Sequence, residues 1–363
     1  MTKRDYSVDL FRIVATLFVV ALHILNQGGV VQSAPEGSAI YWCTSFLRIG
    51  SYCAVNCFGI ISGYIMVNKT IRLKNIIGLW LQIIFYSVLI TALFFVFVPE
   101  TRTIKSLVFS FLPILSERWW YISSYFALFF CIPFLNAAIN HLSQETFKKI
   151  ILVILIGVCV IDCTFPNDTF KINGGYSPIW LIILYLFGAY IRKYDFKQKI
   201  TASKSLLLYF AMIILTLLSK IVIRFITGAV FGQARYDNQF ISYISITIVL
   251  ASVFLFLFCL NTKVSGASAK LIGFFAPTTL SVYLIHVHPF VFEYLLKDAF
   301  VSFANMNAVV SVIVIFIATL AIFVICSLLD LLRIQAFKFI RIGKLCEFIE
   351  NKLTNIYSKV FKA

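Results

Sequence analysis

The first apolar segment of the chain, DYSVDLFRIVATLFVVALHILN (residues 5–26), carries Asp9, Arg12 and His23. Arg12 and His23 are eleven positions apart, which in an α-helix is three turns plus about 20°. The two side chains therefore face the same side of a helix, with Asp9 one turn before Arg12. An imidazole suits general-base chemistry near neutral pH, and a guanidinium binds phosphates. We therefore take Asp9, Arg12 and His23 as candidate catalytic residues.

The elements that must position these residues are strongly apolar. Of the 363 residues, 61% are hydrophobic and 13% are charged, and the mean hydropathy is +0.95. Long continuous apolar runs are typical of membrane-spanning helices, because lipid offers the backbone no hydrogen-bond partners. We predict an all-α, polytopic membrane protein with about ten transmembrane helices. The predicted spans cover residues 11–31, 43–67, 76–98, 119–139, 149–165, 177–191, 205–226, 241–260, 271–295 and 308–328.

The distribution of positive charge predicts the orientation. Lysine and arginine concentrate in the segments on the side of the N-terminus, including residues 192–204 and the tail after Asp330. Cytoplasmic loops carry such an excess, so we expect a multi-pass protein of the cell membrane with both termini in the cytoplasm. The net charge of +16 then reflects topology and contact with anionic membrane lipids, and we expect no nucleic-acid partner. The nine scattered cysteines predict no metal site.

The chain divides into a predicted transmembrane domain, residues 1–330, and a basic amphipathic tail, residues 331–363. Apolar residues in the tail recur every three or four positions, with basic residues interleaved upstream. This pattern predicts a C-terminal helix that lies on the inner leaflet. The apolar positions are Leu345, Ile349, Leu353, Ile356 and Val360, and the basic ones are Lys338, Arg341 and Lys344.

Several further residues are candidates for substrate binding. Aromatic rings stack on sugars and a carboxylate accepts hydrogen bonds from hydroxyls, so the stretch with Glu117, Trp119, Trp120 and Tyr121 predicts a sugar-binding lip or, alternatively, an interfacial aromatic belt. Tyr283 and His286 share one helix face and bind either substrate or a neighbouring helix. Lys220 and Arg224 lie one turn apart near the outer end of a span. They either extend to the headgroups or hold an anionic acceptor.

A second group of residues lies at the predicted cytoplasmic side. The dipeptide Ser62-Gly63 and the following Tyr64 offer a close helix approach and two hydroxyls. Lys69, Arg72 and Lys74 form a basic loop, which is either a positive-inside signal or a clamp for phosphates.

The motif Asp9-x-x-Arg12, ten residues and then His23 resembles the opening of the membrane acyltransferase-3 family. Further stretches that resemble the family are FGIISGYIM (58–66), RWWYISSYFALFFCIPFL (118–135), YLFGAYIRKY (185–194) and TTLSVYLIHVHPF (278–290). They follow one another in order across the predicted spans.

The resemblance implies an integral-membrane O-acyltransferase that moves an acetyl group from cytoplasmic acetyl-CoA to a surface carbohydrate, with His23 and Arg12 as its essential pair. Where the family often has an R-x-x-R pair, this chain has Lys69 and Arg72. Arg12, Lys69, Arg72, Lys74, Ser62 and Tyr64 are then expected to bind coenzyme A. The alternative is a proton-coupled transporter or flippase, because such carriers also use intramembrane ionisable residues.

Overall fold

The computed structural model of the protein describes residues 4–165 and 168–361, and these residues form helices and turns with no β-strand. Within this part of the chain, seven helical segments are long and apolar enough to cross a membrane, which confirms the predicted all-α membrane class. They are α1 (Tyr6–Leu25), α3 (Ala39–Ser51) with α4 (Ala54–Met66), α5 (Leu73–Phe97), α7 (Trp120–His141), α10 (Ala202–Phe231), α12 (Gly266–Phe275) with α13 (Thr279–His286), and α15 (Ala308–Phe339).

The other three predicted spans coincide with shorter helices. The prediction at 149–165 falls on α8 (Gln144–Ile154), which continues as the π-helical segment η2 (Leu155–Asp162). Those at 177–191 and 241–260 fall on α9 (Pro178–Lys193) and α11 (Ile246–Asn261). A helix of 16 residues is about 24 Å long, which is shorter than the hydrocarbon core. The count of ten spans and the side of the termini therefore remain predictions.

Two of the long segments are interrupted in the middle. The backbone turns at Tyr52 and Cys53 between α3 and α4, and the short 3-10 segment η5 (Ala276–Thr278) separates α12 from α13. Pro277 within η5 lacks an amide hydrogen and cannot continue a regular helix. Irregular backbone at membrane depth occurs where it is buried in protein or lines a cavity. Both interruptions here border the cavity described below.

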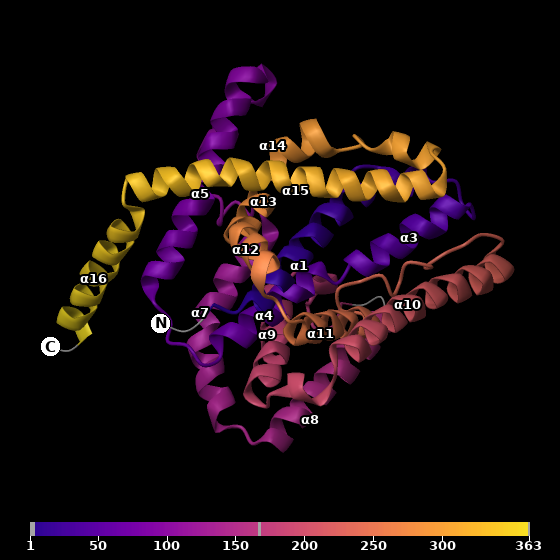
Figure 1. The fold of residues 1–363 in the computed structure, drawn as a ribbon, viewed down its shortest axis with the longest axis horizontal. Helices are drawn as coiled ribbons and strands as arrows, with labels where there is room; N and C mark the ends of the chain where they lie inside the picture. Colours follow the sequence, from indigo (N-terminus) through magenta and orange to yellow (C-terminus); the bar gives the residue numbers. More distant parts are fainter. Residues whose placement is uncertain (1–3, 166–167, 362–363) are drawn as a thin grey trace.

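Helix α1 lies in the middle of the molecule (Figure 1), where it contacts α3, α4, α11, α13 and α15. Helices α4 and α9 pack closely together. A Cβ atom at Gly63 would lie 1.9 Å from the carbonyl oxygen of Tyr185, and one at Gly188 would lie 1.9 Å from that of Ile60. Only glycine fits at either position, so the expected close helix approach at Gly63 is confirmed.

The C-terminal part consists of two helices. Helix α15 continues through the predicted domain boundary after residue 330 and ends at Phe339. Helix α16 (Ile342–Phe361) then turns away and packs against α5 (Figure 1). Leu345, Leu353 and Ile356 are exposed on it, and its position on the inner leaflet stays a prediction. The side chain of Val360 lies outside the described residues.

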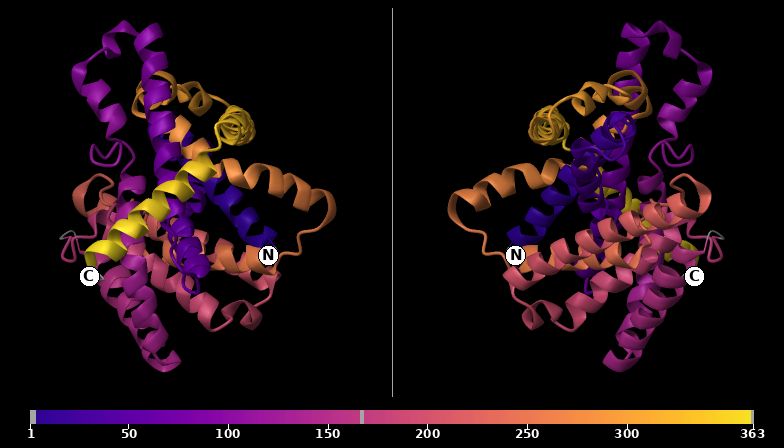
Figure 2. Two further views of the ribbon diagram at one scale, coloured as in Figure 1. Left: turned by 90° about the vertical axis from the view of Figure 1, so that its left-hand side faces the viewer. Right: turned by 90° about the vertical axis from the view of Figure 1, so that its right-hand side faces the viewer.

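The remaining elements are short. Helix α5 and the following α6 (Ile104–Phe111) project beyond the neighbouring helices (Figure 2). The others are α2 (Val30–Ser33), η1 (Pro99–Thr101), η3 (Asn173–Gly175), η4 (Phe196–Lys199), α14 (Pro289–Val291), η6 (Phe292–Leu296) and η7 (Val301–Asn305).

Candidate active site

Helix α1 positions the first candidate residues. It begins where the Asp5 carboxylate accepts hydrogen bonds from the backbone amides of Ser7 and Val8, a common N-cap. One turn later, the buried carboxylate of Asp9 accepts from Arg4 Nε at 2.5 Å and from Arg12 Nη1 at 3.1 Å. Asp9 therefore holds the Arg12 guanidinium against the helix. The Arg12 side chain is still 37% exposed, so its other N–H groups are available to a ligand.

His23 lies three turns further along α1 and pairs with a second histidine. Its Nδ1 atom is 3.0 Å from Nε2 of His286 on α13. The other ring nitrogen of His286, Nδ1, is 2.5 Å from the carbonyl oxygen of Val282. Both histidines are thus joined in one chain of hydrogen bonds that ends on the backbone of α13.

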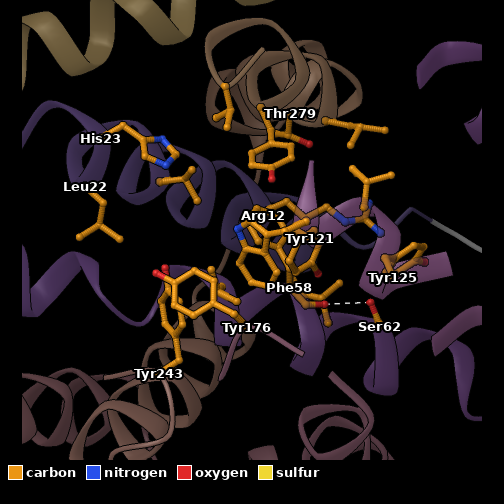
Figure 3. Close-up of a pocket in the computed structure, with 18 of the residues that line it drawn as sticks. Arg12, Leu22, His23, Phe58, Ser62, Tyr121, Tyr125, Tyr176, Tyr243 and Thr279 are labelled. Atoms are coloured by element: carbon orange, nitrogen blue, oxygen red, sulfur yellow. Dashed lines mark hydrogen bonds between the residues drawn. The ribbon is translucent and has the colours of Figure 1, made fainter. Parts of the chain in front are cut away.

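A cavity of about 760 Å³ runs along α1. Its lining includes Arg12, His23 and Gln27, so it extends over roughly 22 Å of helix axis. Figure 3 shows His23, Tyr176 and Tyr243 toward one end of this lining and Ser62 and Tyr125 toward the other. One continuous space therefore connects the Arg12 end of α1, His23, and the end of α1 near Gln27.

Aromatic side chains from α7 and from the segments that precede α4, α9 and α11 form much of the cavity wall. Trp120 packs on Tyr176 with ring centroids 4.7 Å apart, and Tyr52 packs on Tyr243 at 4.8 Å. Such a wall is typical of ligand sites, in which a few polar groups orient the ligand among apolar ones. The hydroxyl of Tyr283 is buried and has no hydrogen-bond partner among the described residues. Its O–H hydrogen is therefore not used by another side chain or backbone carbonyl among the described residues.

Some of the residues predicted from the sequence line this cavity and some lie behind it. Asp9 and His286 are behind the lining and contact Arg12 and His23, respectively. The predicted residues in the lining are Arg12, His23, Ser62, Trp120, Tyr121 and Tyr283. Sequence reasoning missed Tyr52, Tyr125, Tyr176 and Tyr243. These tyrosines come from segments far apart in the sequence, and only their packing brings them together.

Other predicted residues lie outside the lining. Tyr64 is buried, and its hydroxyl accepts from Arg192. Trp119 is 1% exposed and packs on His288, with ring centroids 5.7 Å apart. Glu117 occupies an exposed turn with a φ of 48°. The structure thus places these three side chains away from the cavity.

Lys220 and Arg224 belong to an ion-pair network outside the cavity. The Lys220 ammonium is 2.7 Å from Asp237, and Arg224 is 2.6 Å from Glu36 and 3.5 Å from Asp237. Burial alone would raise the pKa of Asp237, but its hydrogen bond to Lys220 and the charges of Lys220 and Arg224 hold that pKa below its ordinary value. Both basic residues are thus neutralised by carboxylates of the protein.

The basic loop before α5 and the first turn of α5 contact the C-terminal helix. Lys74 Nζ is 2.7 Å from Glu347, and Arg72 is 3.7 Å from Glu350. The hydrogen bond and charge of Lys74 lower the pKa of Glu347. Lys69 is exposed on the same loop. None of these cations lines the cavity, and two of them hold α16.

Across the described residues, no group of three or more His, Cys, Asp or Glu side chains is placed to hold a metal ion. The fold and the cavity define an integral membrane protein with a histidine and an arginine on one intramembrane cavity.

Residues 5–329 match the family model of an acyltransferase domain, and the chain belongs to this acyltransferase-3 family. The resemblance deduced from the sequence motifs is thereby confirmed. No match was found among curated proteins or among solved structures.

Proposed function

We propose that this protein transfers an acetyl or other short acyl group from cytoplasmic acyl-CoA to a hydroxyl of a cell-surface or lipid-linked carbohydrate. The observation that carries the proposal is the continuous cavity along α1, with Arg12, His23 and Gln27 in its lining. Membership in a family of acyltransferases favours this function over the alternative of a transporter.

The reaction needs a base for the acceptor hydroxyl. His23 takes the hydroxyl proton while the hydroxyl oxygen attacks the thioester carbonyl carbon. The carbon–sulfur bond then breaks, and the departing thiolate takes the proton back from His23. The products are the ester of the acceptor and free coenzyme A. The unpartnered hydroxyl of Tyr283 would donate to the carbonyl oxygen as negative charge develops there.

The donor would bind at the Arg12 end. Arg12 uses one nitrogen for Asp9 and keeps other donors for a phosphate. Ser62 also belongs to this end of the lining. Lys69, Arg72 and Lys74 would add charge at the loop, but Arg72 and Lys74 must then share their charge between phosphates and the carboxylates of α16.

The acceptor would bind at the opposite end. Trp120, Tyr176 and Tyr243 offer rings for stacking on a sugar, and the Asn26 and Gln27 amides offer hydrogen bonds to its hydroxyls. This set replaces Glu117 and Trp119 as the proposed first contacts, because it lines the cavity that reaches His23.

The test compares His23→Ala and Arg12→Lys with the unchanged protein in membranes supplied with radiolabelled acetyl-CoA. We expect His23→Ala to lower the transfer rate by at least about 100-fold, since general-base catalysis contributes this much. Arg12→Lys should mainly raise the KM for the donor, because lysine loses the two-pronged contact with phosphate. His141→Ala, at an exposed helix end, is the control. Full activity of either cavity variant at normal expression would refute the proposed site.

A further inference from the structure

The hydrogen-bond chain through His23 and His286 fixes where the protons lie. The carbonyl oxygen of Val282 can only accept, so Nδ1 of His286, which is 2.5 Å away, must carry a hydrogen. A neutral imidazole has one hydrogen, and Nε2 of His286 therefore presents a lone pair. This lone pair faces Nδ1 of His23 at 3.0 Å. Two lone pairs at this distance repel each other, so His23 must carry its hydrogen on Nδ1.

We infer that His286 is a positioning residue that holds His23 in the tautomer with a free lone pair on Nε2. This inference rests on the proposed function for its catalytic meaning. Because Nδ1 of His23 is bound to His286, Nε2 is the only nitrogen of His23 that can take the proton from the carbohydrate hydroxyl. His23 lines the cavity, whereas His286 lies behind it, so the lone pair is on the nitrogen that remains available to substrate.

The surroundings of His286 make this arrangement rigid. Its side chain is buried, so water does not compete for its two hydrogen bonds. Helix α13 is tied to its neighbours through Ser281, whose hydroxyl donates to Asp330 on α15 at 2.5 Å and accepts from Gln82 on α5 at 2.7 Å. Thr278 adds a hydrogen bond to Ser327 on α15 at 2.9 Å. The segment that carries His286 is therefore held by α5 and by α15.

Two polar substitutions separate positioning from a merely structural role. In His286→Gln, the side-chain oxygen reaches the place of Nε2 and can still accept from His23. In His286→Asn, the shorter side chain reaches only the place of Nδ1, so Nδ1 of His23 loses its hydrogen-bond partner. We expect kcat to fall less than about tenfold in the Gln variant and about 100-fold or more in the Asn variant, with the KM for the acyl donor similar in both. Equal loss in the two variants would overturn the inference.

A second measurement reads the tautomer directly and needs no activity. The chain contains four histidines, so nitrogen spectra of the full-length protein, labelled with ¹⁵N-histidine and held in lipid bilayers, contain few signals. His23→Ala identifies the His23 pair of signals. We expect a protonated Nδ1 and a bare Nε2 for His23 in the unchanged and Gln proteins, and a mixture in the Asn protein. A protonated Nε2 in the unchanged protein would refute the inference. If His23 shows the expected tautomer but the protein transfers no acyl group, the proposed function is refuted and the inference about His286 stands.

Discussion

At the scale of single residues, the site depends on buried polar groups, each of which has a definite ion-pair or hydrogen-bond partner. Asp9 orients Arg12, His286 contacts His23, and each partner lies behind the cavity lining. Removing one member of a buried pair costs more than the net value of the pair, because the remaining group stays desolvated without a partner. Tyr283 is the exception, since this residue lines the cavity and its buried hydroxyl lacks a partner among the described residues.

Replacing Tyr283 by Phe tests the proposed contact with the acyl carbonyl. The change removes one hydroxyl and keeps the ring that packs on Tyr121. We expect kcat to fall by about 100-fold with little change in the KM for the donor, as for other oxyanion donors. Tyr64→Phe, which loses a hydroxyl outside the cavity, is the matched control and should keep its kcat. An unchanged kcat in Tyr283→Phe would assign the hydroxyl no role in transfer.

Replacing Asp237 by Asn tests the ion-pair network. The Lys220 side chain is 4% exposed and would lose its counterion, so we expect a loss of about 3 kcal/mol in the free energy of unfolding at pH 7. Because the pKa of Asp237 is lowered in the folded state, its contribution is complete above its ordinary pKa near 4 and disappears as the pH falls through the lowered value.

Thermal unfolding in detergent at a series of pH values measures this difference. The gap between the unchanged protein and Asp237→Asn should close as the pH falls below about 4. Glu145→Gln removes an exposed pair with Lys149 and should change little at any pH. A gap that is the same at all pH values would show that charge is not its cause.

At the scale of elements, interruptions and small residues create the site. The breaks between α3 and α4 and at η5 bring Tyr52 and Pro277 to the cavity. Glycines at the contact of α4 and α9 allow these helices to touch, which places the backbone of Tyr185 against Gly63, the residue after Ser62. Helix α16 adds a further constraint, because its carboxylates bind Arg72 and Lys74 at the N-terminal end of α5.

Replacing Glu347 and Glu350 together by Gln tests whether this loop binds the donor. If Arg72 and Lys74 contact the phosphates, the carboxylates of α16 compete with them, and their removal should lower the KM for acyl-CoA several-fold at unchanged kcat. The measurement is the dependence of the transfer rate on acyl-CoA concentration, with Glu145→Gln as the control. An unchanged or higher KM would show that these ion pairs only hold α16 in place.

At the scale of the whole molecule, the cavity follows the long axis of α1 and is lined near both of its ends. Under the proposed function, a donor and an acceptor would approach His23 from opposite sides of the membrane, and neither would cross it. This use requires the Arg12 end to face the cytoplasm, where acyl-CoA is found. The bias of lysine and arginine toward that side predicts this orientation.

Reporter fusions at the two termini test the orientation. We expect a reporter at either end to be active in the cytoplasm and protected from protease added outside intact cells. A fusion at the loop after α10, near residue 235, should behave in the opposite way and serves as the control. Termini on opposite sides would require an odd number of spans.

The sequence by itself determined the membrane class, the family and the stripe with Asp9, Arg12 and His23, because each depends on composition or on helical spacing within one segment. Its ten predicted spans include the seven long ones, whereas α9 and α11, with 16 residues each, are too short for their length to decide whether they cross. Only the tertiary structure decided which side chains share the cavity. Trp119 and Trp120 are adjacent, yet one packs on His288 and the other lines the cavity. The pairing of His23 with His286 joins residues 263 positions apart. Such contacts depend on how the helices pack, which no local spacing encodes.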